Sequence, residues 1–89
     1  MNHVRLRPDV ACREVDGEFY LLTADNVFHS VTDPVGAFVL GLLDSVEDRS
    51  RDEIIDRVRE EFDGIGDSMP AEIAAFLADL IERGIAVET

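Results

Sequence analysis

The sequence predicts an α+β fold in which a three-stranded antiparallel sheet is followed by three helices, the layout of a winged helix-turn-helix domain. Two observations support this prediction. Residues 10–31 contain short apolar runs separated by turn residues, whereas the apolar residues after Pro34 recur at helical spacing. The last helical segment, residues 70–84, is followed at once by another short apolar run. Because the strands precede the helices, we expect the helices to lie together on one face of the sheet.

Three short strands are expected at residues 10–15, 19–22 and 27–31. Asp16-Gly17 separates the first two, and Asp-Gly between apolar runs is a strong hairpin signal because such a turn needs positive φ angles. Asn26, in the second turn, can adopt the left-handed conformation. The third strand should lie at the edge of this meander. It contains neither proline nor an acidic or arginine side chain, with which proteins commonly protect an edge strand.

Three helices are expected to follow, at residues 34–43, 51–62 and 70–84. Thr32 or Asp33 can cap the first helix, whose side chains are apolar on nearly every side, so that it should be the buried helix. Ser50 and Glu53 have the spacing of a capping box at the start of the second. Asp63-Gly64 should end the second helix, and Gly84 can close the third in a left-handed conformation.

The chain length allows one domain, which we assign to residues 10–89, with residues 1–9 as an N-terminal arm that is expected to be frayed. The apolar and charged contents, 46% and 31%, are those of a globular protein and not of a disordered tail. No apolar run approaches the roughly 20 residues that span a bilayer, and the arm lacks the apolar stretch of a signal peptide. A cytoplasmic location is therefore expected.

Side chains that support catalysis or metal binding are nearly absent from the sequence. Cys12 is the only cysteine, so no intrachain disulfide can form, and no activating base can be identified for its thiol. His3 and His29 each lack a second histidine or cysteine at ligand spacing. The carboxylates are spread along helix faces and are not paired within a pocket. We therefore expect a protein that is not an enzyme and uses no metal or cofactor.

The charge argues against nucleic acid and anionic membranes as partners. The net charge is −12, and all eight basic residues are arginine. Residues 32–89 hold fifteen acidic residues and five arginines, a net charge of −10. A recognition helix usually presents Arg, Lys, Asn or Gln to DNA, whereas the third helix offers Glu72, Asp79 and Glu82 against Arg83. A DNA-binding winged helix is thus the least favoured function, and cationic partners are favoured.

The third strand and the third helix are predicted to form the two walls of a peptide-binding groove. An edge strand has unpaired N–H and C=O groups, which can pair with an extended peptide while alternate side chains of the peptide enter pockets. The alternatives are that the N-terminal residues cover the strand or that a second copy of the chain does so, which would give a homodimer.

Three segments, residues 33–44, 49–55 and 76–85, form a recognisable pattern in their order and spacing. They resemble, in turn, three motifs of the PqqD-like peptide chaperones, also called RiPP recognition elements. These motifs are an Asn-x-x-Gly-Ala helix ending in Leu-Leu-Asp-Gly, an Arg-Thr/Ser-x-x-Glu-Ile helix start, and a Phe-Leu-x-x-Leu-x-x-x-Gly ending. Asp33 and Ser45 stand where the family commonly has Asn and Gly, which are local capping or turn changes.

The resemblance implies a non-catalytic domain that captures the leader segment of a ribosomally synthesised precursor peptide by β-strand addition. The domain would present the leader to a modifying enzyme such as a radical SAM enzyme, a cyclase or a protease. In this family the leader pairs with the third strand and lies against the third helix. Carried over, this assigns the peptide-binding site to Val27, Phe28, His29, Ser30, Val31, Ile73, Phe76, Leu77 and Leu80.

The sequence leaves two points of this assignment open. A shift of one residue in strand register would exchange Phe28 and Ser30 with their neighbours between the two faces of the sheet. The alternative function is a structural adaptor subunit, which would use the same edge strand to bind an enzyme in a larger complex. The acidity of the chain further suggests a leader with Lys or Arg near its apolar anchors.

Overall fold

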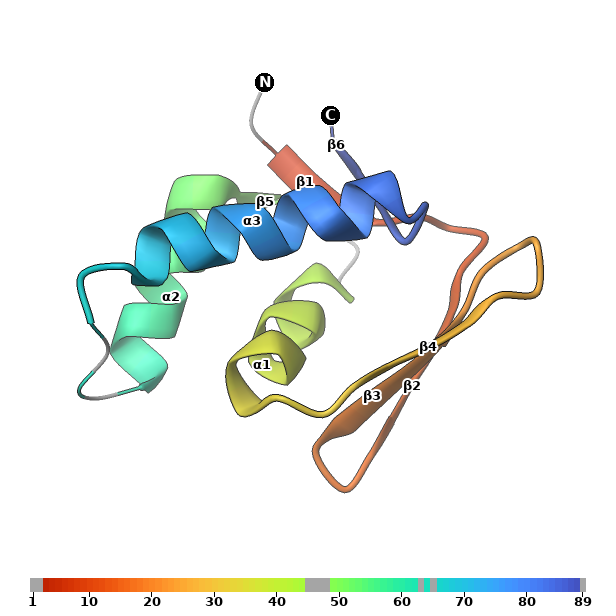
Figure 1. Ribbon diagram of the computed structural model, residues 1–89, viewed down its shortest axis with the longest axis horizontal. Helices are drawn as coiled ribbons and strands as arrows, with labels where there is room; N and C mark the ends of the chain where they lie inside the picture. Colours follow the sequence, from red (N-terminus) through yellow and green to blue (C-terminus); the bar gives the residue numbers. More distant parts are fainter. Residues whose placement is uncertain (1–2, 45–48, 63, 65, 89) are drawn as a thin grey trace.

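The computed structural model describes residues 3–44, 49–62, 64 and 66–88, which form three helices and two small antiparallel sheets (Figure 1). The strands are β1 (His3–Leu6), β2 (Ala11–Val15), β3 (Glu18–Leu22), β4 (Phe28–Val31), β5 (Arg49–Ser50) and β6 (Ala86–Glu88). The helices are α1 (Pro34–Leu43), α2 (Arg51–Glu61) and α3 (Met69–Glu82). The predicted α+β class is confirmed. Ser45 and Asp63, to which the sequence analysis assigned turns, lie outside the described residues.

The meander β2-β3-β4 has the predicted connections. Asp16 and Gly17 have φ angles of 52° and 82°, as the expected hairpin turn requires, and Asn26 is left-handed at 67°. Strand order is β2-β3-β4, so β4 is an edge strand. It begins one residue later than expected, because Val27 belongs to the turn: Thr23 N–H donates to Val27 O at 3.0 Å.

The N-terminal residues depart from the expected fold. We expected a frayed arm, but β1 is the central strand of a second sheet of order β5-β1-β6. His3 is aligned with Ser50 and Leu6 with Ala86, and the Val4 side chain is fully buried. The partners of β1 lie more than 40 residues away along the chain. No local pattern in the sequence could therefore reveal this pairing.

Side-chain caps begin two of the three helices. Gly36 N–H donates to Asp33 Oδ2 at 2.9 Å, so Asp33 and not Thr32 caps α1. Glu53 N–H donates to Ser50 Oγ at 3.1 Å at the start of α2, which is one half of the expected capping box. The Glu53 carboxylate instead accepts a bond of 2.6 Å from Arg49 Nη1.

The core surrounds α1, which lies between the sheet β2-β3-β4 and α2 (Figure 1). This confirms that the apolar first helix is the buried one. Gly84 ends α3 with a φ of 77°, as expected, and turns the chain into β6. The largest fully buried side chains come from all three helices and both sheets; they are Leu21, Leu40, Leu43, Ile54, Leu77, Ile85, Val4, Val39 and Val58. Burying each contributes roughly 1.5–3 kcal/mol.

None of the described helices is long and apolar enough to cross a membrane.

Candidate functional site

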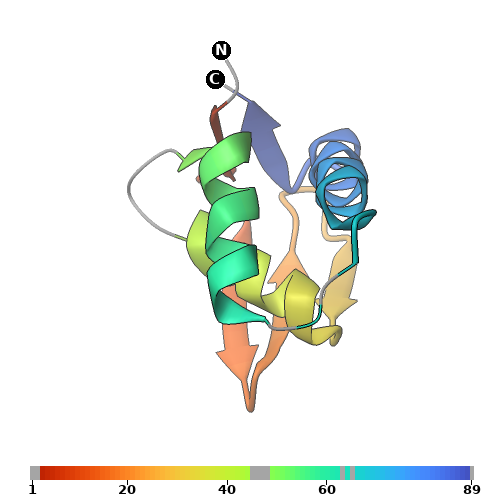
Figure 2. The same cartoon turned by 90° about the vertical axis from the view of Figure 1, so that its left-hand side faces the viewer.

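A groove runs between β4 and α3. β4 is the strand of its sheet that lies nearest to α3 (Figure 2). One hollow of about 390 Å³ is bordered by β4, the residues that follow it and the C-terminal half of α3. A second hollow of about 240 Å³ lies between the start of α1 and the N-terminal half of α3. Asp33 and Phe76 border both hollows, so the two adjoin and form one groove, which we call the β4–α3 groove.

The side chains of β4 alternate between the two faces of its sheet. His29 and Val31 are half-buried on the face toward α3, and both border the groove. Phe28 points to the opposite face, where it is 63% exposed and stacks on Tyr20 with ring centroids 6.0 Å apart. Ser30 shares the exposed face but still borders the groove. The register that the sequence left open is therefore defined in the structure.

The backbone of β4 presents hydrogen-bonding groups at the open edge of the sheet. Residue pairs in an antiparallel ladder alternate between hydrogen-bonded and non-hydrogen-bonded. The bond from Thr23 N–H to Val27 O marks a hydrogen-bonded pair, which makes His29 and Val31 the next two residues bonded to β3. The intervening residues Phe28 and Ser30 therefore direct their N–H and C=O groups away from β3. These groups are the ones that an added strand would meet.

The predicted residues of α3 fall into two groups. Ile73, Phe76 and Leu80 border the groove, and Phe76 is the most accessible of them because the other two are largely buried. Leu77 is fully buried and borders neither hollow. The prediction that Leu77 forms part of the groove wall is therefore corrected. One step along the helix from Phe76 turns the side chain by about 100°, here into the core. Val27 is exposed in the turn and also lies outside the groove.

Gly36 lets the two walls of the groove approach each other. A Cβ atom at this position would lie 2.9 Å from Val31 Cγ1 of β4 and 3.4 Å from Phe76 Cζ of α3. The first separation is shorter than carbon atoms tolerate, so a larger residue would push Val31 aside. Gly36 therefore shapes the floor of the groove.

The rim of the groove carries mostly negative charge. Asp33, Glu72 and Asp79 border it, and Arg83 is the only basic residue that borders the described hollows of this groove. Arg83 Nε donates to Asp79 Oδ2 at 2.8 Å, so its charge is largely compensated. Sequence reasoning did not assign these charged residues to the site. The helical spacing of Asp79 and Arg83 with Phe76 and Leu80 could have revealed these two charged residues.

His29 contributes a polar atom that lacks a partner. Its Nε2 is buried and, within the described part of the chain, forms no hydrogen bond. An unpaired buried polar atom costs about 1–3 kcal/mol, and its ring borders the groove. A hydrogen-bonding group of a bound ligand would remove that cost.

The thiol of Cys12, on β2, is not activated as a nucleophile. Burial, together with the negative charges of Asp44 and Glu14, raises the pKa of the Cys12 thiol to about 11. The thiol is therefore protonated at neutral pH and is a poor nucleophile. Among the described residues, no three His, Cys, Asp or Glu side chains come close enough to hold a metal ion.

Comparisons with known proteins give the same fold. TbiB1 in complex with the TbiA(beta) leader peptide is 20% identical, with a TM-score of 0.80 over 92% of this chain and 93% of that chain. Lasso peptide synthetase B1, complexed with the leader peptide, is 22% identical, with a TM-score of 0.74 over 94% of this chain and 96% of that one. The heterocyclase TruD is 18% identical, with a TM-score of 0.68; the match covers 98% of this chain but 11% of TruD.

At these identities the structural likeness shows the fold alone. A search of the curated proteins finds no match to the sequence. The family model described as coenzyme PQQ synthesis protein D (PqqD) matches residues 20–86, which is well over half of the chain. That match includes β4, α1, α2 and α3, and with them both walls of the β4–α3 groove. The resemblance found in the sequence is thereby confirmed, and the chain belongs to the PqqD family.

Proposed function

We propose that the chain is a non-catalytic domain that captures the leader segment of a ribosomally synthesised precursor peptide and presents it to a modifying enzyme. The open edge of β4 carries this proposal: the N–H and C=O groups of Phe28 and Ser30 face outward beside the β4–α3 groove. Two structural neighbours, TbiB1 and lasso peptide synthetase B1, are complexes with leader peptides, which supports it.

The leader is expected to bind as an additional strand on β4. Its backbone would pair with Phe28 and Ser30, and every second side chain would enter the groove above Phe76 and Leu80. His29 Nε2 would accept or donate a hydrogen bond to one of these side chains. Lys or Arg residues of the leader would meet the acidic rim, which would raise the association rate more than the affinity.

The modifying enzyme would be a radical SAM enzyme, a cyclase or a protease, as is implied by the family. The precursor is made by ribosomes, so the domain would act in the cytoplasm. In this proposal residues 10–89 act as a single domain, to which we add the strand β1, because β1 pairs with β6 and its Val4 side chain belongs to the core.

A titration with the leader of a precursor peptide encoded beside the gene for this chain tests the proposal. Isothermal titration calorimetry should show one-to-one binding, and the backbone amides of Phe28 and Ser30 should become protected from hydrogen exchange. Raising the salt concentration from 50 to 500 mM should slow association several-fold, since screening weakens attraction between exposed charges. Absence of leader binding at both salt concentrations would overturn the proposal.

The same titration distinguishes the other occupants of the edge. If the modifying enzyme binds and the leader does not, the domain is a structural adaptor. If the chain forms a homodimer through β4, size-exclusion chromatography with light scattering should give twice the monomer mass, and the leader should dissociate the dimer.

A further inference from the structure

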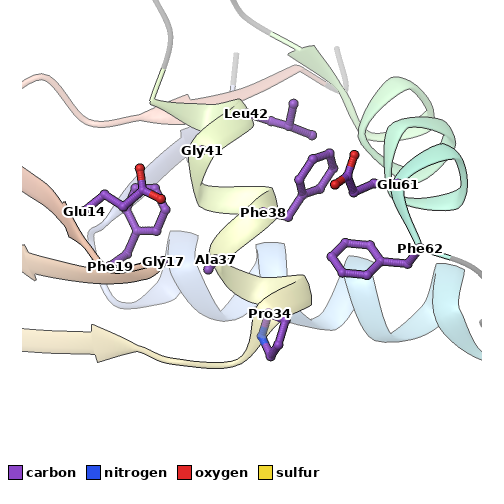
Figure 3. A pocket seen from close by; sticks show the side chains of 10 residues that line it. All are labelled: Glu14, Gly17, Phe19, Pro34, Ala37, Phe38, Gly41, Leu42, Glu61 and Phe62. Atoms are coloured by element: carbon purple, nitrogen blue, oxygen red, sulfur yellow. The ribbon is translucent and has the colours of Figure 1, made fainter.

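A third hollow, of about 490 Å³, lies between the β2-β3 hairpin, α1 and the C-terminal end of α2 (Figure 3). We call it the α1–α2 hollow. The face of α1 that borders this hollow differs from the face that carries Val35 and Gly36, which border the β4–α3 groove. A ligand in one site would therefore leave the other open. Its volume falls within the range of about 300–1,000 Å³ that is usual for binding pockets.

The floor of this hollow is apolar and aromatic. Phe38 and Phe62 pack edge to face, with ring centroids 5.6 Å apart and an angle of 87° between the rings. Phe19 lies on the opposite side of the hollow (Figure 3). Between them, Gly41 is exposed although it lies within α1, so the helix backbone itself forms part of the floor. Such a floor suits an inserted apolar side chain.

The charged side chains that line the hollow are Glu14 and Glu61, one from the hairpin and one from α2. Both are exposed, and neither takes part in an ion pair among the described residues, whereas other carboxylates of the chain are paired with arginines. Two unpaired carboxylates beside an aromatic floor attract a cation that stands next to an apolar group.

We propose that the α1–α2 hollow docks the modifying enzyme through a segment in which an apolar side chain is flanked by Lys or Arg. The inference rests on the proposed function, because presenting a leader requires a second surface that the leader does not occupy. Charge complementarity selects this occupant. A second copy of the chain carries a net charge of −12, and nucleic acid is a polyanion, so the overall charge of either disfavours its approach to the two carboxylates.

Substitution of Gly41 tests the docking site without disturbing the leader site. A Cβ atom at Gly41 would meet only Phe19 Cζ, at an ordinary contact distance of 3.8 Å, and replacing a helical glycine removes a source of instability. Gly41→Leu should therefore fold, fill the hollow and block the enzyme. Gly41→Ala is the matched control, because a methyl group leaves most of the hollow open.

The measurement is the affinity of the full-length modifying enzyme encoded beside this chain for the chain saturated with its leader, by biolayer interferometry. Gly41→Leu should weaken enzyme binding at least tenfold, and Gly41→Ala less than twofold. The double change Glu14→Gln and Glu61→Gln should also weaken it about tenfold. The change Asp67→Asn with Glu82→Gln, equal in charge but outside the hollow, should have little effect.

Leader affinity, measured in parallel, should be the same in all four variants. An enzyme that does not bind the wild-type complex, or that binds Gly41→Leu as tightly as wild type, overturns the docking site while the leader site stands. Failure of the wild-type chain to bind the leader overturns the proposed function instead. Circular dichroism confirms that each variant is folded.

Discussion

The two sites on either side of α1 differ in what they can recognise. The β4–α3 groove is bounded by a strand edge, so a ligand can bind through backbone groups that every peptide has. The α1–α2 hollow is bounded mainly by side chains and a helix surface, and Glu14 is its one lining residue from an edge strand, β2. A backbone-pairing site tolerates variation in its ligand, whereas a side-chain site selects by shape and charge. The β4–α3 groove is therefore suited to a leader peptide whose sequence can vary, and the α1–α2 hollow to one particular enzyme.

The largest effect should come from removing a single outward N–H at the edge of β4. Ser30→Pro deletes a donor that faces away from β3, and proline is tolerated at such positions of edge strands. We expect leader binding to weaken about 100-fold or more while the fold and enzyme docking persist. Ser30→Ala, which keeps the N–H, should bind nearly as wild type. Calorimetry with both variants would contradict strand addition if they bound the leader equally.

Adjacent residues of α3 should separate ligand contact from core packing. Leu77→Ala should lower the free energy of unfolding by about 2–5 kcal/mol, because it leaves a cavity in the core. Phe76→Ala should cost less stability, since Phe76 is only partly buried, but should weaken leader binding about tenfold. Urea unfolding and leader titration of both variants provide the measurement. If Leu77→Ala weakened leader binding more than Phe76→Ala did, the assignment of Phe76 to the groove wall would be wrong.

Replacing His29 should separate stability from recognition within the groove. His29→Phe removes a buried nitrogen that has no partner, so we expect the free energy of unfolding to rise by about 1 kcal/mol. Leader affinity should fall about fivefold, through loss of one hydrogen bond to the peptide. Nitrogen-15 chemical shifts of the imidazole should change when the wild-type chain binds its leader. Unchanged shifts with unchanged affinity would exclude His29 as a ligand contact.

The smallest expected effect reports on the negative potential beside the α1–α2 hollow. Burial and the charges of Asp44 and Glu14 raise the pKa of Cys12 to about 11, so about one thousandth of the thiol is ionised at pH 8. Alkylation by iodoacetamide should be slow at pH 8 and increase about tenfold per pH unit up to pH 10. Glu14→Gln removes one negative charge, so it should lower the pKa slightly and speed alkylation at pH 8. A fast reaction at pH 7 would contradict the raised pKa.

Short-range signals in the sequence were sufficient for most of the fold. The hairpin at Asp16-Gly17 and the end of α3 at Gly84 follow from residues that accept positive φ, and the structure has both. The cap by Ser50 follows from a side chain that reaches a backbone N–H three residues later. Each of these features depends on atoms within a few residues of one another. That is why the sequence by itself could determine them.

The sequence also identified the two elements that form the walls of the candidate groove, but not which of their side chains border it. The alternation of β4 and the helical period of α3 each allow several rotations of the side chains until the elements are packed together. Only packing shows that Phe76 borders the groove while Leu77 is buried, and that Asp79 and Arg83 stand at the rim. The unpartnered nitrogen of His29 had no signal in the sequence, because it depends on which groups pack around the ring.

Only the tertiary structure decided the contacts between residues that are distant along the chain. The strand β1 acquires its partners from β5 and β6, both of which lie more than 40 residues further along the chain. The α1–α2 hollow likewise joins Glu14 to Glu61. Such pairings depend on loop closure and on the burial of apolar surface by the whole chain. Local patterns determine the elements of this protein, and the common core determines which of their surfaces meet.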